Sequence, residues 1–232
     1  MTGTAQAAAP LGTADNRREQ MLRAALEVIA DRGYADTRIA DVAERIGISP
    51  ALVIYYFKTK DKLLTDAIRY LDNLWYAEGQ RRMAALPTAP ERIEEVVAMS
   101  CLPEADAEPG SSWTLWLDFW TLAARNPEVA ALRQRDDERW REMVSSLVRD
   151  GQRTSEFRPV DPDDFAALLC SLLDGFAVQI ALRDPVVGPE RAFELCMHFI
   201  ADQLGFEWKG SQRRLGGGGQ AGQANGARQK GR

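Results

Sequence analysis

The chain has 232 residues, long enough for one or two domains with a real hydrophobic core, and its formal net charge is −5 at pH 7. The charge is uneven: residues 1–60 carry +1, residues 61–208 carry −12 and residues 209–232 carry +6. Because an acidic middle repels nucleic acid, any contact with DNA is expected at the amino-terminal end, with non-specific attraction added by the basic tail.

Several other protein classes lack support in the sequence. The start has no charged segment followed by a long apolar core, and no run of about 18 apolar residues indicates a membrane span. Cys101, Cys170 and Cys196 are widely spaced in apolar surroundings, which indicates buried thiols rather than a disulfide framework or a metal site. With His198 as the one histidine and no glycine-rich phosphate loop, neither an enzyme site nor a cofactor is expected, and the protein is expected in the cytoplasm.

The chain is expected to begin with a disordered arm, residues 1–14, which are rich in Ala, Thr and Gly. Apolar residues at helical spacing then predict a first helix over residues 15–32, and Gly33 stops it. Residues 37–64 read TRIADVAERIGISPALVIYYFKTKDKLL and predict two further short helices. Gly47 ends the first of these, Ser49 caps the second, and Pro50 stands at its first position.

This layout predicts a helix-turn-helix, whose second helix lies in the major groove of DNA. Val53 and Phe57 are four residues apart and are expected to pack inward, so the rest of the second helix faces outward. An ordinary helical hairpin, with tyrosines covering a core edge, is the alternative. The predicted DNA-contacting residues are Thr37, Arg38, Ser49, Ala51, Leu52, Ile54, Tyr55, Tyr56 and Lys60.

The residues that carry a family resemblance in this segment are Gly33, Tyr34, Val42, Ala43, Gly47, Ser49, Tyr56, Phe57, Lys60, Leu63 and Leu64. With them, residues 17–64 resemble the DNA-binding domain of the TetR family of bacterial regulators. The family usually has a tyrosine where this chain has Ile54, and often a threonine at Arg38. Because Ile54 cannot donate a hydrogen bond to a phosphate, Tyr55 and Tyr56 are expected to carry more of that work.

The rest of the chain predicts six more helices, bounded by prolines and glycines. They are expected from residue 60 to before Pro87, from Pro90 to about 101, and over 112–125, 127–149, 162–181 and 189–204, with a loop at 103–112. The predicted fold is therefore all-α, with an amino-terminal three-helix head. The domains expected are a helix-turn-helix head at 15–60, a six-helix ligand-binding and dimerisation body at 61–208, and a flexible basic tail at 209–232.

The helix after Pro162 is apolar nearly all round, which indicates burial on more than one side. It is either the central helix of a monomeric bundle or part of a dimer interface. The resemblance implies the dimer, because the family pairs its last two long helices and two half-sites about 34 Å apart need two heads. The interface residues expected are Phe165, Leu168, Leu169, Leu172, Phe176, Phe193, Cys196 and Phe199.

The densest aromatic cluster lies at residues 113–120, where Trp113, Trp116 and Trp120 share one helical face. These rings are either core filler or the walls of a ligand pocket, and aromatic walls beside a carboxylate suit a cation. Asp118 lies off that face, so the carboxylate would be Asp174 or Glu142. The predicted pocket residues are Trp113, Trp116, Leu117, Trp120, Trp140, Met143 and Phe176.

The tripeptide Ala51-Leu52-Val53, the WLDFW stretch at residues 116–120 and LLDGF at residues 172–176 resemble the BetI-type branch of the family. The resemblance implies a homodimeric repressor that binds double-stranded operator DNA and is released by a small-molecule effector of unknown identity. An enzyme, or a helical sensor that has lost DNA binding, are the other classes considered. Exposed Tyr55, Tyr56 and Lys60 would have no purpose in such a sensor.

Overall fold

The computed structural model describes residues 14–102 and 111–210, and this part of the chain folds into nine helices, as the all-α prediction requires. The helices are α1 (Ala14–Asp36), α2 (Ile39–Arg45), α3 (Pro50–Phe57), α4 (Lys60–Ala84), α5 (Ala89–Cys101), α6 (Ser111–Ala123), α7 (Pro127–Arg153), α8 (Pro162–Ala181) and α9 (Pro189–Leu204). Most of the predicted arm, loop and tail lie outside the described residues.

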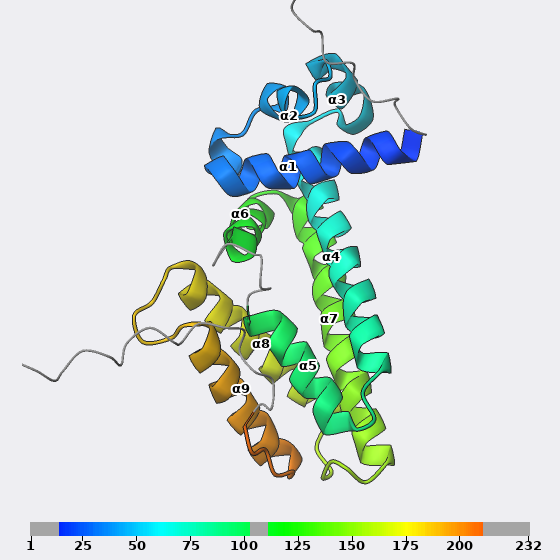
Figure 1. The fold of residues 1–232 in the computed structure, drawn as a ribbon, viewed down its shortest axis with the longest axis vertical. Helices are drawn as coiled ribbons and strands as arrows, with labels where there is room; N and C mark the ends of the chain where they lie inside the picture. Colours follow the sequence, from blue (N-terminus) through cyan, green and yellow to red (C-terminus); the bar gives the residue numbers. More distant parts are fainter. Residues whose placement is uncertain (1–13, 103–110, 211–232) are drawn as a thin grey trace, which may run out of the picture.

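Helices α1, α2 and α3 form a head at one end of the molecule, and α4 and α7 run lengthwise away from it (Figure 1). The turns of the head follow the predicted chemistry. Gly33 and Gly47 have φ angles of 77° and 68°, which favour glycine, and the Ser49 hydroxyl accepts from the Leu52 N–H at 3.3 Å. Val53 and Phe57 are fully buried in the core that α3 shares with α2 and α4, so the outward arc of α3 is fixed.

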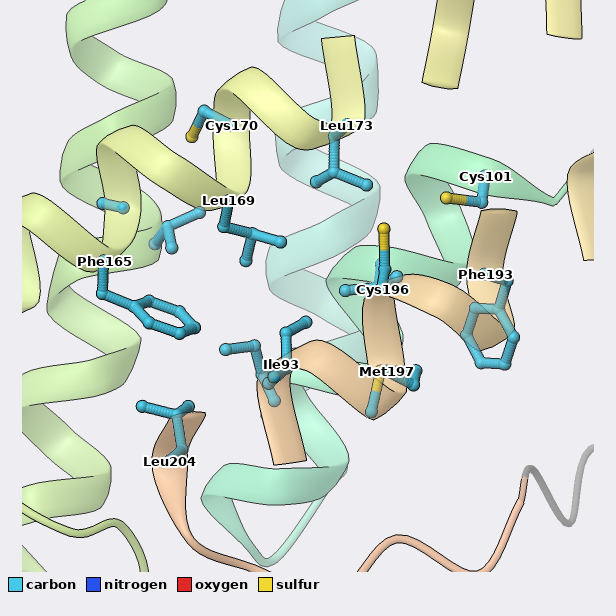
Figure 2. Packing of buried hydrophobic residues seen from close by; sticks show 14 of the residues in the cluster. Ile93, Cys101, Phe165, Leu169, Cys170, Leu173, Phe193, Cys196, Met197 and Leu204 are labelled. Atoms are coloured by element: carbon cyan, nitrogen blue, oxygen red, sulfur yellow. The ribbon is translucent and has the colours of Figure 1, made fainter. Parts of the chain in front are cut away.

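The body has its own core, formed where α5, α8 and α9 pack beside α7. Figure 2 shows Leu169 and Leu173 of α8 pointing toward Ile93 of α5 and Cys196 of α9. The three cysteines are buried and free, as predicted. The thiols of Cys101 and Cys196 contact each other, and this contact together with burial raises the pKa of Cys101.

Helix α7 continues to Arg153, so the predicted end near residue 149 is wrong. Gly151, interpreted as a helix stop, is buried inside the helix instead. A Cβ atom at this position would lie 2.1 Å from the ring of Phe157. The glycine therefore serves a close approach between α7 and the segment that follows it, which the sequence pattern does not reveal.

Helix α8 is long and apolar enough to cross a membrane by length and composition, contrary to the expectation that no segment passes this test. Its inner face nevertheless forms the centre of the body core, where Phe165, Leu169 and Leu173 are buried. Core helices of soluble proteins commonly pass the same test. The packing of α8 therefore accounts for its composition.

Candidate DNA-binding surface and ligand cavity

The outward arc of α3 presents apolar and aromatic side chains to solvent at the tip of the head. Tyr55 is 69% exposed and Ile54 46% exposed, and Ala51 is also exposed. Leu52 and Tyr56 are half-buried against the core of the head. Exposed methyl groups can contact thymine methyls in a major groove, and the Tyr55 hydroxyl can donate to a phosphate.

Three predicted contact residues lie at the turns that flank this surface. Arg38 is exposed, whereas Thr37 is buried and its hydroxyl donates to the Gly33 carbonyl at 2.8 Å. The Ser49 hydroxyl caps α3. In this structure Thr37 and Ser49 therefore shape the head, and Arg38 is the one of the three whose side chain is free to reach outward.

Lys60 lies at the first position of α4 and holds the end of α1. Its ammonium donates to the carbonyls of Tyr34 at 2.8 Å, Ala35 at 3.2 Å and Thr37 at 3.0 Å. It also sits 4.2 Å from the centre of the Tyr34 ring. An ammonium has three protons to donate, so this set of acceptors occupies all of them. The phosphate contact expected of Lys60 thus competes with a structural role.

The turn at residues 33–37 also joins the head to the body. Asp118 of α6 accepts a hydrogen bond from the Tyr34 backbone N–H at 2.7 Å. The Tyr34 hydroxyl donates to Asp61 of α4, and burial, followed by this bond, raises the pKa of Tyr34. Figure 1 shows α6 directly beneath α1, in agreement with this hydrogen bond between the two helices. Sequence reasoning located Asp118 off the tryptophan face but missed this partner.

A cavity of about 190 Å³ opens on the other side of α6, between α4, α5, α7 and α8. Five of the six tryptophans in the chain line it. Its lining is Leu71, Asp72, Trp75, Tyr76, Met99, Ser100, Trp113, Trp116, Trp120, Asp136, Asp137, Trp140, Leu173 and Asp174.

The structure brings four of the seven predicted pocket residues together in this cavity: Trp113, Trp116, Trp120 and Trp140. Leu117, Met143 and Phe176 are half-buried and are absent from its lining. Phe176 packs against the core of the body instead. Phe176 lies on a different face of α8 from Asp174, because two residues turn a helix by about 200°.

Four carboxylates share the cavity with the aromatic rings. Asp174 was one of the two candidates from sequence; the other, Glu142, forms an ion pair with Arg149 at 3.2 Å and does not line the cavity. Asp72, Asp136 and Asp137 were missed. The sequence held a signal that could have identified two of them. Asp72 stands three residues before Trp75, and Asp136 four residues before Trp140, so each carboxylate shares a helical face with an indole ring.

These carboxylates are costly to ionise. Burial, then the nearby charge of Asp136, raises the pKa of Asp72 to about 6. Burial, then the charge of Asp137, raises the pKa of Asp174 to about 6. Burial also raises the pKa values of Asp136 and Asp137. A cation bound among them would replace the lost hydration and restore their charge.

The residues predicted for the dimer interface separate into two groups. Phe165, Leu169, Phe193 and Cys196 are buried within the single chain. Leu172, Phe176 and Phe199 are half-buried, and Leu168 is 62% exposed. Leu182 and Val186, just after α8, are 71% and 77% exposed and were not predicted. An apolar surface therefore remains uncovered along α8 and the loop that follows it.

The chain matches two described protein families. Residues 21–67 match the bacterial regulatory proteins of the tetR family, and residues 89–205 match the carboxyl-terminal domain of BetI-type transcriptional repressors. The transcriptional regulator BetI 1 of Chromohalobacter salexigens is 31% identical over 195 residues, 84% of this chain and 93% of the relative. BetI of Escherichia coli K12 is 30% identical over 200 residues, 84% of this chain and 97% of the relative.

Solved structures share the fold. A transcriptional regulator from Saccharomonospora viridis, solved in complex with choline, superposes with a TM-score of 0.73 at 28% identity, covering 80% of this chain and 96% of the other. A TetR-family regulator from a Rhodococcus species gives a TM-score of 0.71 at 22% identity, covering 82% and 99%.

The chain thus belongs to the TetR family of transcriptional regulators and carries a BetI-type regulatory domain. It is a DNA-binding helix-turn-helix protein, and its relatives are regulators, not enzymes. Regulators of this family bind operator DNA and small-molecule effectors and generally act as dimers.

Proposed function

We propose that the protein is a homodimeric, cytoplasmic repressor that leaves its operator when a small organic cation occupies the tryptophan cavity. One observation carries the proposal: five indoles and four carboxylates surround a single cavity of about 190 Å³. Indole faces attract cations most strongly where water is excluded. A neutral ligand would offer no counter-charge to the cavity carboxylates that have no arginine within ion-pair distance, at a cost in binding free energy.

The size of the cavity and one structural relative favour a compact cation. The S. viridis regulator, similar over 80% of this chain, was solved with choline, a quaternary ammonium compound. Choline cannot donate hydrogen bonds from its cationic head, so aromatic faces and nearby carboxylates suit it. Choline is therefore the first effector to test on this protein.

Helix α6 offers the connection between ligand and DNA. Trp113, Trp116 and Trp120 line the cavity on one side of it, and Asp118 holds the Tyr34 N–H on the other. A ligand that binds better when α6 is displaced must weaken the operator-bound arrangement by the same factor. The expected direction is release of DNA.

The domain limits proposed are a DNA-binding head at residues 15–60 and a ligand-binding and dimerisation body at residues 61–208. Helix α4 begins at Lys60 and runs from the head to the cavity through Leu71, Asp72 and Trp75. The uncovered apolar surface around Leu168 supports pairing of the bodies. Pairing would set two α3 helices at the spacing of successive major grooves.

A gel-shift assay on the DNA that flanks the protein's own gene tests this function. The expected result is a retarded band at low protein concentration that choline, but not sodium chloride at equal ionic strength, removes. The absence of a band in every flanking fragment would reject the DNA-binding role of the head, and a band that no organic cation removes would reject the effector class.

A further inference from the structure

The four cavity carboxylates form two pairs, one on each side of α7. The first pair is Asp72 of α4 with Asp136 of α7, and the charge of Asp136 opposes ionisation of Asp72. The second pair is Asp137 of α7 with Asp174 of α8, and the charge of Asp137 opposes ionisation of Asp174. Consecutive residues of a helix diverge by about 100°, so Asp136 and Asp137 direct the two pairs toward different neighbours.

Each pair contains one carboxylate that an arginine balances. Arg139 lies 3.6 Å from Asp72, and Arg133 lies 3.3 Å from Asp137. Within residues 14–102 and 111–210, Asp136 and Asp174 form no ion pair of that kind. At longer range Arg69 lowers the pKa of Asp136, and Arg133 followed by Arg141 lowers the pKa of Asp174. One oxygen of Asp136 is buried and accepts no hydrogen bond. Each pair therefore retains one carboxylate without a close counter-charge.

Aromatic rings line the cavity beside both pairs. Trp140 stands one helical turn after Asp136 and Asp137 on α7, and its ring meets that of Trp75 edge to face at 5.3 Å. Methylene groups can pack against such indole rings and are removed from water when they do so. The cavity thus has apolar aromatic walls and two acidic pairs, one between α4 and α7 and one between α7 and α8. We call the first pair the Asp136 end of the cavity and the second pair the Asp174 end.

From this arrangement we infer that the preferred effector carries two ammonium groups joined by a short alkyl chain, with one ammonium at the Asp136 end and the other at the Asp174 end. The inference rests on the proposed function and narrows its ligand class. A single cation neutralises one pair and leaves the carboxylate of the other without a counter-charge. A diammonium compound satisfies both, while its methylene groups cover Trp75 and Trp140.

Matched amines test the inference. Putrescine and butylamine have the same carbon chain and differ by one ammonium, and each is titrated into the full-length protein while tryptophan fluorescence is recorded. We expect putrescine to bind at least about tenfold more tightly, as one additional charge-assisted contact gives. Asp136→Asn and Asp174→Asn should each abolish the preference for putrescine, so that putrescine and butylamine bind the variant with nearly equal affinity. Glu142→Gln, a carboxylate of α7 outside the cavity, should change neither.

Choline in the same assay distinguishes a failure of this inference from a failure of the proposed cationic effector. Equal binding of putrescine and butylamine, with choline or either amine quenching the fluorescence, overturns the two-ended ligand and leaves a cationic effector standing. A putrescine preference that survives in both asparagine variants overturns the assignment of the two ends. If choline, butylamine and putrescine all fail to bind the wild-type protein, both the inference and the cationic effector are rejected.

Discussion

The carboxylate of Asp118 accepts a hydrogen bond of 2.7 Å from the Tyr34 backbone N–H, and so ties the helix beside the ligand cavity to the turn that ends α1. Tyr34 is held from the other side by Lys60 and Asp61 at the start of α4. Helices α4 and α6, which both line the cavity, are therefore both hydrogen-bonded to Tyr34. A displacement of either helix reaches the head at Tyr34.

Replacing Asp118 should uncouple ligand from DNA without removing either site. Asp118→Ala leaves the Tyr34 N–H without its acceptor, at a cost of about 1–3 kcal/mol, whereas Asp118→Asn keeps an acceptor oxygen. We expect choline to bind the alanine variant normally but to weaken its operator binding by a smaller factor than in the wild type. The asparagine variant should keep most of the coupling. Ligand affinity measured with and without operator gives this factor directly. An unchanged factor in Asp118→Ala would rule out this route.

Lys60 and Lys58 should differ in their effect on the salt dependence of DNA binding. The Lys60 ammonium is occupied by three carbonyls, whereas Lys58 is exposed at the end of α3 and contacts only the Tyr55 carbonyl and ring. Lys60→Ala should therefore lower the melting temperature and leave the salt slope unchanged. Lys58→Ala should reduce the slope of log K against log salt by about one unit with little change in stability. A reduced salt slope in Lys60→Ala, with an unchanged slope in Lys58→Ala, would show that Lys60 contacts a phosphate and that Lys58 does not.

The raised pKa of Asp174 predicts a cost in stability at neutral pH. Its folded pKa of about 6 exceeds the ordinary value of 3.8, so the folded state binds more protons between these values and stability falls as pH rises through that window. The charges that face Asp174 are Asp137, Arg133 and Arg141. In the ligand-free protein, Asp174→Asn should raise Tm by about 2–4 °C at neutral pH, equivalent to about 1 kcal/mol. The gain should be smaller at about pH 5, where the folded carboxyl is already protonated.

The affinity for choline should depend on pH in the opposite direction from the stability of the ligand-free protein. A protonated carboxyl has no charge to offer, so the affinity of the wild type should fall as pH drops through about 6, the folded pKa of Asp72 and Asp174. Isothermal titration across this range measures it. A flat profile would mean that these two carboxylates do not contact the cation.

The pairing of two bodies can be tested on exposed leucines alone. Leu168 on α8 is 62% exposed, and Leu74 on α4, 45% exposed, is a matched control away from that surface. Leu168→Arg should give monomers in sedimentation and lose operator affinity although the head is untouched, because burying an unpaired charge in an interface costs several kcal/mol. Leu74→Arg should remain dimeric. Dimers of Leu168→Arg at full DNA affinity would place the interface elsewhere.

The fold was largely predictable because its signals are local. The cap at Ser49, the left-handed Gly33 and Gly47, and the helical spacing of apolar residues each depend on a few neighbouring positions. The predicted end of α7 was wrong because Gly151 allows the close approach of the Phe157 ring and does not stop the helix. Such a contact cannot be inferred from the spacing of apolar residues.

The cavity was only half predictable for a related reason. Tryptophans at Trp113, Trp116 and Trp120 stand out at any spacing, whereas a single aspartate on a charged helix such as α7 is ordinarily solvated. Asp136 is partly buried in the folded chain, and Asp72, whose ionisation it opposes, is 64 residues away in the sequence. Two of the three carbonyls that accept hydrogen bonds from Lys60 belong to the backbone of α1 and the third to Thr37, and a backbone carbonyl cannot be recognised from a pattern of side chains.

Ligand occupancy and DNA release should be one event, and a single sample can show it. Fluorescein-labelled operator is bound to the protein, choline is added, and tryptophan fluorescence and operator anisotropy are read at each step. We expect both signals to change with the same midpoint, and Trp116→Leu, which keeps an apolar side chain in the cavity wall, to move both midpoints together to higher concentration. Quenching that saturates while the operator stays bound, or release that Trp116→Leu leaves unaltered, would contradict control of DNA binding by this cavity.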